Sequence, residues 1–225
     1  MVPVLAYWDI RGLAEAIRYL LAHTGVEYQD KRYGFGSAPN WNRDQWLAEK
    51  YILGLDFPNL PYYVDDDVKL TQSLAILKYL GRKHGLAPET PKKQHRVDVA
   101  EMQAFDLMMS NIRLCYDPEY NDEKRKVYLE GFQEKADQFS RFLGDHAFIA
   151  GDHVTYADFL LYESLDGIRA LDSGVLKNHP ILERYMDRVM ALRGLKEYLR
   201  SPRFKSWPFW SPFAQDLGPQ HARRG

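Results

Sequence analysis

The sequence predicts an α/β domain at the N-terminus, followed by an all-helical domain. Two observations predict the first domain: residues 2–33 read as strand, loop, helix and strand, and residues 56–79 read as a Pro-rich turn, two short strands and a helix. A third observation predicts the second domain: apolar residues recur at helical spacing from about residue 92 to about residue 199. The segment GLAPETP at residues 85–91 has the composition of a linker. We therefore expect one domain at 1–84 and the other at 92–225.

The first half of the N-terminal domain has the order of a βαβ unit. Residues 2–7 form a short β-prone run, the apolar residues from Leu13 to Leu21 share one helical face, and Gly25 suits the helix C-cap. Residues 27–33 read as a second strand, which implies a parallel pair with a right-handed crossover. Together with the hairpin and helix that follow, this is the order of a thioredoxin-like domain.

The first loop of such a domain decides its chemistry. Disulfide chemistry requires C-x-x-C in that loop, whereas this chain has WDIR at residues 8–11. Any chemistry must therefore come from a bound thiol or from other residues. Tyr7 ends the first strand, where open α/β sheets bind ligands at their carboxyl edge. The commoner alternative for a lone tyrosine is a place in the core.

The hairpin precedes a helix whose N-terminus is a candidate anion site. Residues 62–64 and 68–70 are β-prone and flank three aspartates at 65–67, which predicts a hairpin with a three-residue loop. The tripeptide TQS then opens the helix, where free N–H groups favour a carboxylate. The alternative is that Thr71 or Ser73 is only an N-cap, which nearly every helix needs.

A second candidate anion site follows a long polar loop at residues 34–44. Arg43, Trp46 and Lys50 stand at i, i+3 and i+7, so they share one face of a short helix. Two cations around an indole could hold a carboxylate, and arginine can do so with two hydrogen bonds. The alternative is a solvated helix with an exposed pair of cations.

The helical domain carries clear folding signals. Thr155 and Asp158 have the spacing of a capping box, and Val154 and Phe159 that of a hydrophobic staple, so we assign Asp158 to folding and not to catalysis. Two apolar series mark other helices: Leu129, Phe132, Ala136, Phe139 and Leu143, and also Met102, Phe105, Met109 and Ile112.

Composition excludes several classes of function. The 225 residues carry a net charge of −1 at pH 7, which argues against nucleic acid as a partner. The single cysteine, Cys115, allows no internal disulfide, and its surroundings in the sequence do not suit a nucleophile. The histidines lack metal-ligand spacing, so we expect no metal site. No apolar leader and no run of about 18 apolar residues is present, so we expect a cytoplasmic protein without membrane contact.

Several motifs in one order resemble the cytosolic glutathione S-transferases, most of all the mu class. The likeness extends over nearly the whole chain, including the tail. The tail is unusually aromatic at residues 204–213, and its side-chain bulk there departs from the mu pattern. The motifs that carry it are YWDIRGL at 7–13, KRYGFGSAP at 31–39, RDQWLAEK at 43–50, LGLDFPNLPY at 53–62, TQS at 71–73 and GDHVTYADFL at 151–160.

The resemblance implies a role for each matching position in glutathione binding. Tyr7 would donate its hydroxyl hydrogen bond to the glutathione sulfur. Asn59 and Leu60 would face the cysteinyl backbone, with Leu60–Pro61 in cis. The remaining glutathione contacts would be Trp8, Arg43, Trp46 and Lys50 at the glycine end, Gln72 and Ser73 at the γ-glutamyl carboxylate, and Asp106 of the second subunit at the ammonium.

The resemblance also implies an electrophile pocket and a homodimer. Tyr116 would face the electrophile as an acid or hydrogen-bond donor. Phe57, on a Pro-rich turn, would be inserted into the second subunit as an interface key; the alternative is packing within its own domain. Independently of the resemblance, residues 220–225 are expected to be disordered because they end the chain. The pocket would be formed by Ile10, Leu13, Ile112, Tyr116, Phe209 and Trp210, although the sequence leaves open which of the last two lines it.

The implied activity is conjugation of the glutathione thiolate to hydrophobic electrophiles, a detoxification reaction. Glutathione would be a co-substrate, and no other cofactor is expected. The alternative is a non-catalytic carrier that stores hydrophobic ligands in the same cleft. Tyr7 separates the two, since a carrier needs no donor at the sulfur. A scaffold protein, or a peroxidase or isomerase that uses glutathione, are further alternatives.

Overall fold

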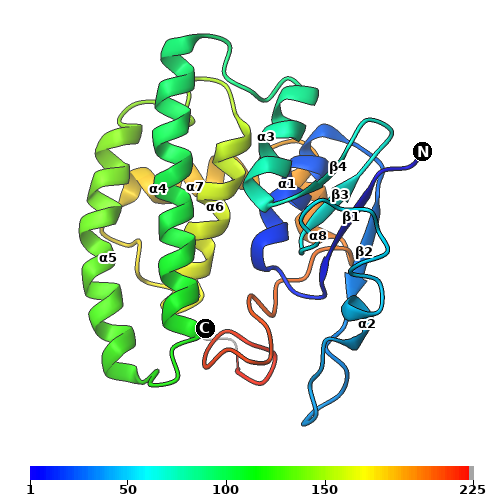
Figure 1. The fold of residues 1–225 in the computed structure, drawn as a ribbon. Coiled ribbons are helices and arrows are strands. Elements are labelled where there is room, and N and C mark those ends of the chain that lie inside the picture. Colours follow the sequence, from blue (N-terminus) through cyan, green and yellow to red (C-terminus); the bar gives the residue numbers. More distant parts are fainter. Residues whose placement is uncertain (223–225) are drawn as a thin grey trace.

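The computed structural model describes residues 1–222, in which a four-stranded sheet with its own helices lies beside a larger helical half (Figure 1). The strand order is β2-β1-β3-β4. Strand β1 (Val4–Trp8) pairs in parallel with β2 (Gln29–Tyr33) and antiparallel with β3 (Tyr62–Val64), which pairs with β4 (Lys69–Thr71). The predicted thioredoxin-like order of strands and helices is therefore confirmed.

The turn between β3 and β4 is one residue longer than predicted. Val64 pairs with Lys69, so Val68 belongs to the turn and not to the strand. Asp65 explains the difference, because its Oδ1 accepts hydrogen bonds from the backbone N–H groups of Asp67 (2.9 Å) and Val68 (3.0 Å). This local bonding of the aspartate outweighs the β-propensity of a single valine.

Two helices lie between the sheet and the helical half: α1 (Glu15–Thr24) and α3 (Ser73–Lys83) (Figure 1). A short 3₁₀ helix, η1 (Gly12–Ala14), leads into α1, and α2 (Asp44–Leu47) follows the long loop after β2. Gly25 ends α1 with a φ of 70°, as the sequence predicts.

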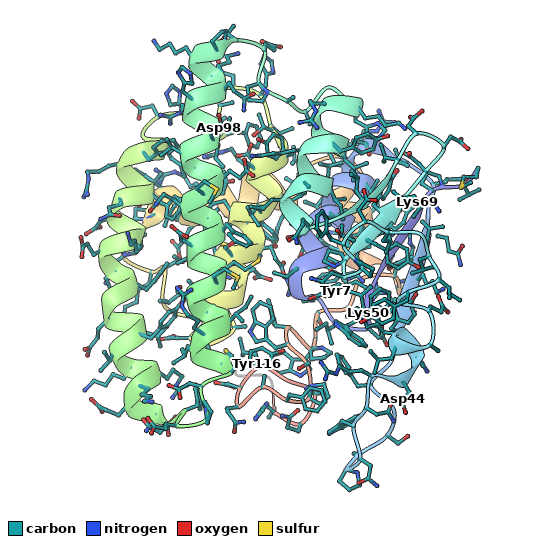
Figure 2. All side chains as sticks on the ribbon, in the orientation of Figure 1. Tyr7, Asp44, Lys50, Lys69, Asp98 and Tyr116 are labelled. Atoms are coloured by element: carbon teal, nitrogen blue, oxygen red, sulfur yellow. The ribbon has the colours of Figure 1, made fainter. Side chains whose placement is uncertain are left out.

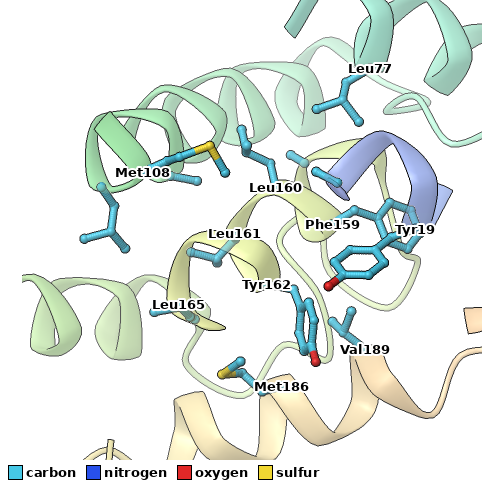
Figure 3. Close-up of a cluster of buried hydrophobic side chains, with 14 of the residues drawn as sticks. Tyr19, Leu77, Met108, Phe159, Leu160, Leu161, Tyr162, Leu165, Met186 and Val189 are labelled. Atoms are coloured by element: carbon cyan, nitrogen blue, oxygen red, sulfur yellow. The ribbon is translucent and has the colours of Figure 1, made fainter. Parts of the chain in front are cut away.

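Within residues 1–222, the helical half contains five helices, with α6 at its centre. They are α4 (Pro91–Cys115), α5 (Asp122–Leu143), α6 (Tyr156–Arg169), α7 (Pro180–Met190) and α8 (Leu195–Arg200). The predicted capping box at the start of α6 is present, and Asp158 is fully buried there, where it accepts hydrogen bonds from Thr155 and Tyr185. Figure 3 shows residues of α6 such as Phe159 and Leu161 packed among side chains of both halves.

The two predicted apolar series behave differently. The series on α5 faces the core, since its last four members are at most 5% exposed. The series from Met102 to Ile112 on α4 lies at an edge of the core face. Met102 is 48% exposed and Phe105 and Ile112 are only partly buried, whereas Ala104 and Met108 are buried in the core. That edge reaches the cavity described below.

The C-terminal tail folds back onto the sheet half. The backbone N–H groups of Arg11 and Gly12 donate to the carbonyl oxygens of Pro208 (3.0 Å) and Phe209 (2.9 Å). The expectation of disorder from residue 220 is wrong at Gln220, whose amide donates to Pro212 O and Ala214 O, and residues 223–225 lie outside the described part of the chain. In residues 1–222, none of the helices combines the length and apolarity that a membrane span requires.

Candidate active site

A cavity of about 390 Å³ lies where the carboxyl end of β1, the C-terminal half of α4 and the tail meet. Figure 2 labels Tyr7 on the sheet side and Tyr116 at the end of α4. Most of the lining is apolar or aromatic. The sheet half contributes Tyr7, Trp8, Ile10, Leu13, Phe35 and Arg43, and the helical half and tail contribute Met109, Ile112, Tyr116, Trp210, Ser211 and Phe213.

Tyr7 is held in one position by the loop that follows β1. Its hydroxyl oxygen accepts a hydrogen bond from the Leu13 backbone N–H (3.2 Å). Gly12 has a φ of +49°, and a Cβ built there would lie 2.5 Å from the Tyr7 ring and 2.7 Å from its oxygen, so only glycine fits. Burial raises the pKa of Tyr7 to about 12, which keeps the phenol neutral. Within residues 1–222 the hydroxyl proton has no protein acceptor.

Tyr116 lines the same cavity but has its hydroxyl group engaged. The hydroxyl donates to Ser211 Oγ (2.8 Å) and accepts from the Ser211 backbone N–H (3.0 Å). Burial raises the pKa of Tyr116 as well. The tyrosine therefore joins the end of α4 to the tail.

The three residues of the predicted cationic site differ in burial. Trp46 is only 5% exposed and packs on Tyr33 and Tyr62, so the alternative of a fully solvated helix does not describe it. Arg43 is exposed at the start of α2 and lines the cavity, and Lys50 is half-buried beyond its end. In the described chain neither cation forms an ion pair with a carboxylate, so both charges are available to a ligand.

The other predicted anion site, TQS at residues 71–73, falls at the N-terminus of α3. The N-cap is Gln72, with a φ of 71° and no side-chain cap hydrogen bond, so the alternative that Thr71 or Ser73 is the N-cap is wrong. A positive φ at a residue other than glycine is strained, and such strain concentrates at functional sites. Leu60–Pro61 is cis, and the Leu60 N–H bonds to Asn59 Oδ1 (2.9 Å).

Phe209, which was expected to line the pocket, does not do so. The expected glutathione contacts Trp46, Lys50, Asn59, Leu60, Gln72, Ser73 and Asp106 also lie outside the lining of this cavity. Phe209 is 2% exposed and places its ring 3.8 Å from the Arg11 guanidinium carbon, whereas its neighbour Trp210 lines the cavity and donates to Asn111 Oδ1. Asp106 is exposed on α4, and Phe57 is 77% exposed on its turn.

Sequence reasoning missed four residues of the cavity. Two of them lay in segments that had been singled out: Phe213 in the aromatic tail and Met109 in the apolar series of α4. Phe35 stacks on Trp8 with ring centroids 4.4 Å apart and approaches Phe213 edge-on, a pairing that no local pattern reveals. Ser211 is the fourth. In the described residues, no group of three or more histidine, cysteine or acidic side chains could hold a metal ion.

Comparison with known proteins gives one consistent family. Residues 3–82 match the family model "Glutathione S-transferase, N-terminal domain", and residues 105–202 match "Glutathione S-transferase, C-terminal domain". The chain is 47% identical over 218 residues to "Glutathione S-transferase Mu 2" of Mus musculus, covering 94% of this chain and 100% of the relative. It is 44% identical over 205 residues to a glutathione S-transferase of Dermatophagoides pteronyssinus, covering 91% and 93%.

Solved structures agree with the sequence relatives. The crystal structure of glutathione S-transferase Blo t 8 superposes with a TM-score of 0.87 at 39% identity, covering 94% of this chain and 98% of that one. A Pi-class glutathione S-transferase of Onchocerca volvulus gives 0.82 at 28% identity, covering 96% and 100%. The chain therefore belongs to the glutathione S-transferases, and within that family it is a mu-class enzyme.

Proposed function

We propose that the cavity conjugates the thiolate of glutathione to hydrophobic electrophiles and that Tyr7 is the donor to the sulfur. The observation that carries this role is the buried, neutral Tyr7 hydroxyl, which is fixed by Leu13 N–H and has no protein acceptor for its proton in the described chain. A free thiol has a pKa of about 8.5, so little of it is ionised at pH 7. A donor to sulfur favours the thiolate, and each unit by which the thiol pKa falls is worth about 1.4 kcal/mol.

The two anion sites suit the two ends of the tripeptide. Glutathione carries a carboxylate at each end, so one end could bind at Arg43 with Lys50 and the other at the N-terminus of α3. We assign Trp8, Trp46 and Asn59 to the same binding surface. Holding both ends would fix the sulfur near Tyr7, so the entropy of bringing the reactants together is lost at binding and not in the reaction step.

The electrophile would occupy the apolar part of the cavity, between Ile112, Trp210 and the sulfur. The thiolate attacks the electrophilic carbon, a sulfur–carbon bond forms, and the leaving group departs with its electron pair. Tyr116 is proposed to assist the electrophile, but it must first give up its hydrogen bond to Ser211. We therefore expect its contribution to be smaller than that of Tyr7.

We also propose a homodimer in which Phe57 is the interface key. A large apolar side chain that is 77% exposed needs a partner surface. A small apolar cavity between α4 and α5 suits it, and a two-fold axis would pair each key with the other subunit's cavity. In that dimer Asp106 is assigned to the ammonium of the glutathione bound by the other subunit. This cavity, about 90 Å³, is lined by Val99, Ala100, Gln103, Gln138, Phe139 and Phe142.

Sedimentation velocity tests the dimer. Phe57→Ser should shift the protein towards monomer at micromolar concentration, whereas Tyr51→Ser, which removes a similarly exposed aromatic ring, should leave the dimer intact. Unchanged sedimentation of Phe57→Ser would contradict the assignment.

A cytoplasmic location is proposed from the single buried thiol, Cys115, which suits a reducing compartment.

The function is tested by the rate of conjugation of glutathione to an activated chloronitrobenzene. Wild-type activity well above the uncatalysed rate, lost in Tyr7→Phe, is the expected result. A wild type that binds hydrophobic ligands but reacts no faster than buffer would be a carrier. Equal rates in the wild type and Tyr7→Phe would remove Tyr7 from its assigned role.

A further inference from the structure

Several ion pairs cross the junction between the sheet half and the helical half, and two of them involve a buried glutamate. One joins Arg11, in the loop after β1, to Glu163 on α6. The other joins Lys78 on α3 to Glu101 on α4. In both pairs the glutamate is buried, but only the first pair is next to the active-site loop.

The Arg11 guanidinium is fixed in one orientation. The residue is 1% exposed, and its Nε and Nη2 both donate to the Glu163 carboxylate. Nη2 also donates to Asp166 Oδ2 (2.7 Å) and to the Tyr19 hydroxyl (2.8 Å). Because a planar guanidinium bound in this way has little freedom, the position of α6 determines the position of Arg11.

The same residue fixes both walls of the cavity near Tyr7. Its backbone N–H and that of Gly12 hold the tail at Pro208 and Phe209, while its guanidinium lies over the Phe209 ring. Leu13, which follows Gly12, donates the backbone N–H that holds the Tyr7 hydroxyl. A shift of the Arg11 backbone would therefore displace the Tyr7 oxygen and the tail together.

We propose that Arg11, held by Glu163, is a positioning residue that keeps the Tyr7 hydroxyl directed at the glutathione sulfur. This rests on the proposed role of Tyr7. Arg11 itself does not line the cavity and touches no reacting atom. Its effect is exerted through the loop, because the ion pair with α6 fixes the segment that carries the Leu13 N–H.

The second ion pair supplies a matched control. Glu101 is 0% exposed, accepts from the Tyr156 hydroxyl (3.1 Å) and pairs with Lys78 Nζ (3.1 Å). It joins the same two halves, but it contacts neither the Tyr7 loop nor the tail. Glu163→Gln and Glu101→Gln thus make the same chemical change at two junction sites, and only one of them supports Tyr7.

The experiment titrates the thiol of glutathione bound to each variant, followed by the ultraviolet absorbance of the thiolate, together with kcat/KM and Tm. Glu163→Gln and Arg11→Lys should raise the pKa of the bound thiol and lower kcat/KM on the order of tenfold, since small displacements at a reacting centre cost this much or more. Their KM for glutathione should change far less. Glu101→Gln should match the wild type in thiol pKa.

The outcomes separate the two proposals. If Glu163→Gln lowers the Tm yet keeps the wild-type thiol pKa, Arg11 has only a structural role and the inference is overturned. If Tyr7→Phe itself leaves the thiol pKa unchanged, the role of Tyr7 fails first. Glu163→Gln keeps nearly the same shape, so it provides the test even if Arg11→Lys does not fold.

Discussion

Tyr7 and Tyr116 differ in whether a protein group accepts the proton of the hydroxyl group. Both tyrosines line one cavity, and burial raises the pKa of both. Tyr7 accepts a single backbone hydrogen bond, whereas Tyr116 both donates to and accepts from Ser211. A hydroxyl group has one proton to donate, so Tyr7 can offer it to a ligand without breaking a protein contact and Tyr116 cannot. The hydrogen-bond partners, and not burial, distinguish the two roles.

The largest expected effect is the difference between removing each hydroxyl. Tyr7→Phe should lower kcat/KM by about 10²- to 10³-fold, the usual cost of one donor to developing or stabilised negative charge. Tyr116→Phe should cost at most about tenfold, the value of one ordinary hydrogen bond. Steady-state kinetics with an activated chloronitrobenzene measures both. Equal losses in the two variants would contradict the comparison.

A smaller loss is expected when the support of Tyr7 is disturbed. Gly12→Ala places a methyl group against the Tyr7 ring and oxygen, so kcat/KM should fall about 10- to 100-fold through misplacement of the donor. Gly25→Ala is the control, because Gly25 also has a positive φ but has open space around it. It should cost only about 1 kcal/mol of stability and no activity. Kinetics and thermal melts of both variants show whether activity is lost through the contact with Tyr7 or through strain in the backbone.

Removing the partner of Tyr116 should have a still smaller effect. Ser211→Ala takes away the Oγ that accepts the Tyr116 proton but leaves the backbone N–H of residue 211 in place. We expect a loss of about 1 kcal/mol in stability and only a few-fold change in rate. A loss of activity as large as that of Tyr7→Phe would show that the tail bond is part of the catalytic machinery.

The smallest effect is expected at alkaline pH. Because the pKa of Tyr7 is raised to about 12, the donor stays protonated at pH 10, where an ordinary tyrosine would be half ionised. The rate should therefore not decline up to about pH 10. The folded state holds this proton more tightly than the unfolded state, so the contribution of Tyr7 to stability falls as pH rises from about 10 to about 12. A decline of kcat/KM centred below pH 10 in a protein that remains folded would contradict this.

The fold could be predicted from local sequence because each signal acts over a few residues. Gly25 ends α1 through its own backbone freedom, and Thr155 with Asp158 starts α6 within one turn. The turn of the hairpin was predicted one residue too short. The strand propensity of Val68 does not reveal that the Asp65 side chain accepts hydrogen bonds from the backbone of Asp67 and Val68.

The site was less accessible to local reasoning. From the residues alone, a place in the core was the commoner expectation for Tyr7, and the side chain is in fact both buried and part of a cavity wall. The partner of Tyr116 lies 95 residues away in the sequence, so the bond that occupies its proton is set only by the folded tail. Resemblance to a family indicated which tyrosine to examine, while the structure indicated what holds each hydroxyl group.

The most direct test titrates the thiol of glutathione while it is bound to the protein. We predict that the wild type and Tyr116→Phe lower the thiol pKa well below its free value of about 8.5, and that Tyr7→Phe returns it close to that value. A bound thiol that ionises at the same pH in the wild type and in Tyr7→Phe would contradict the account.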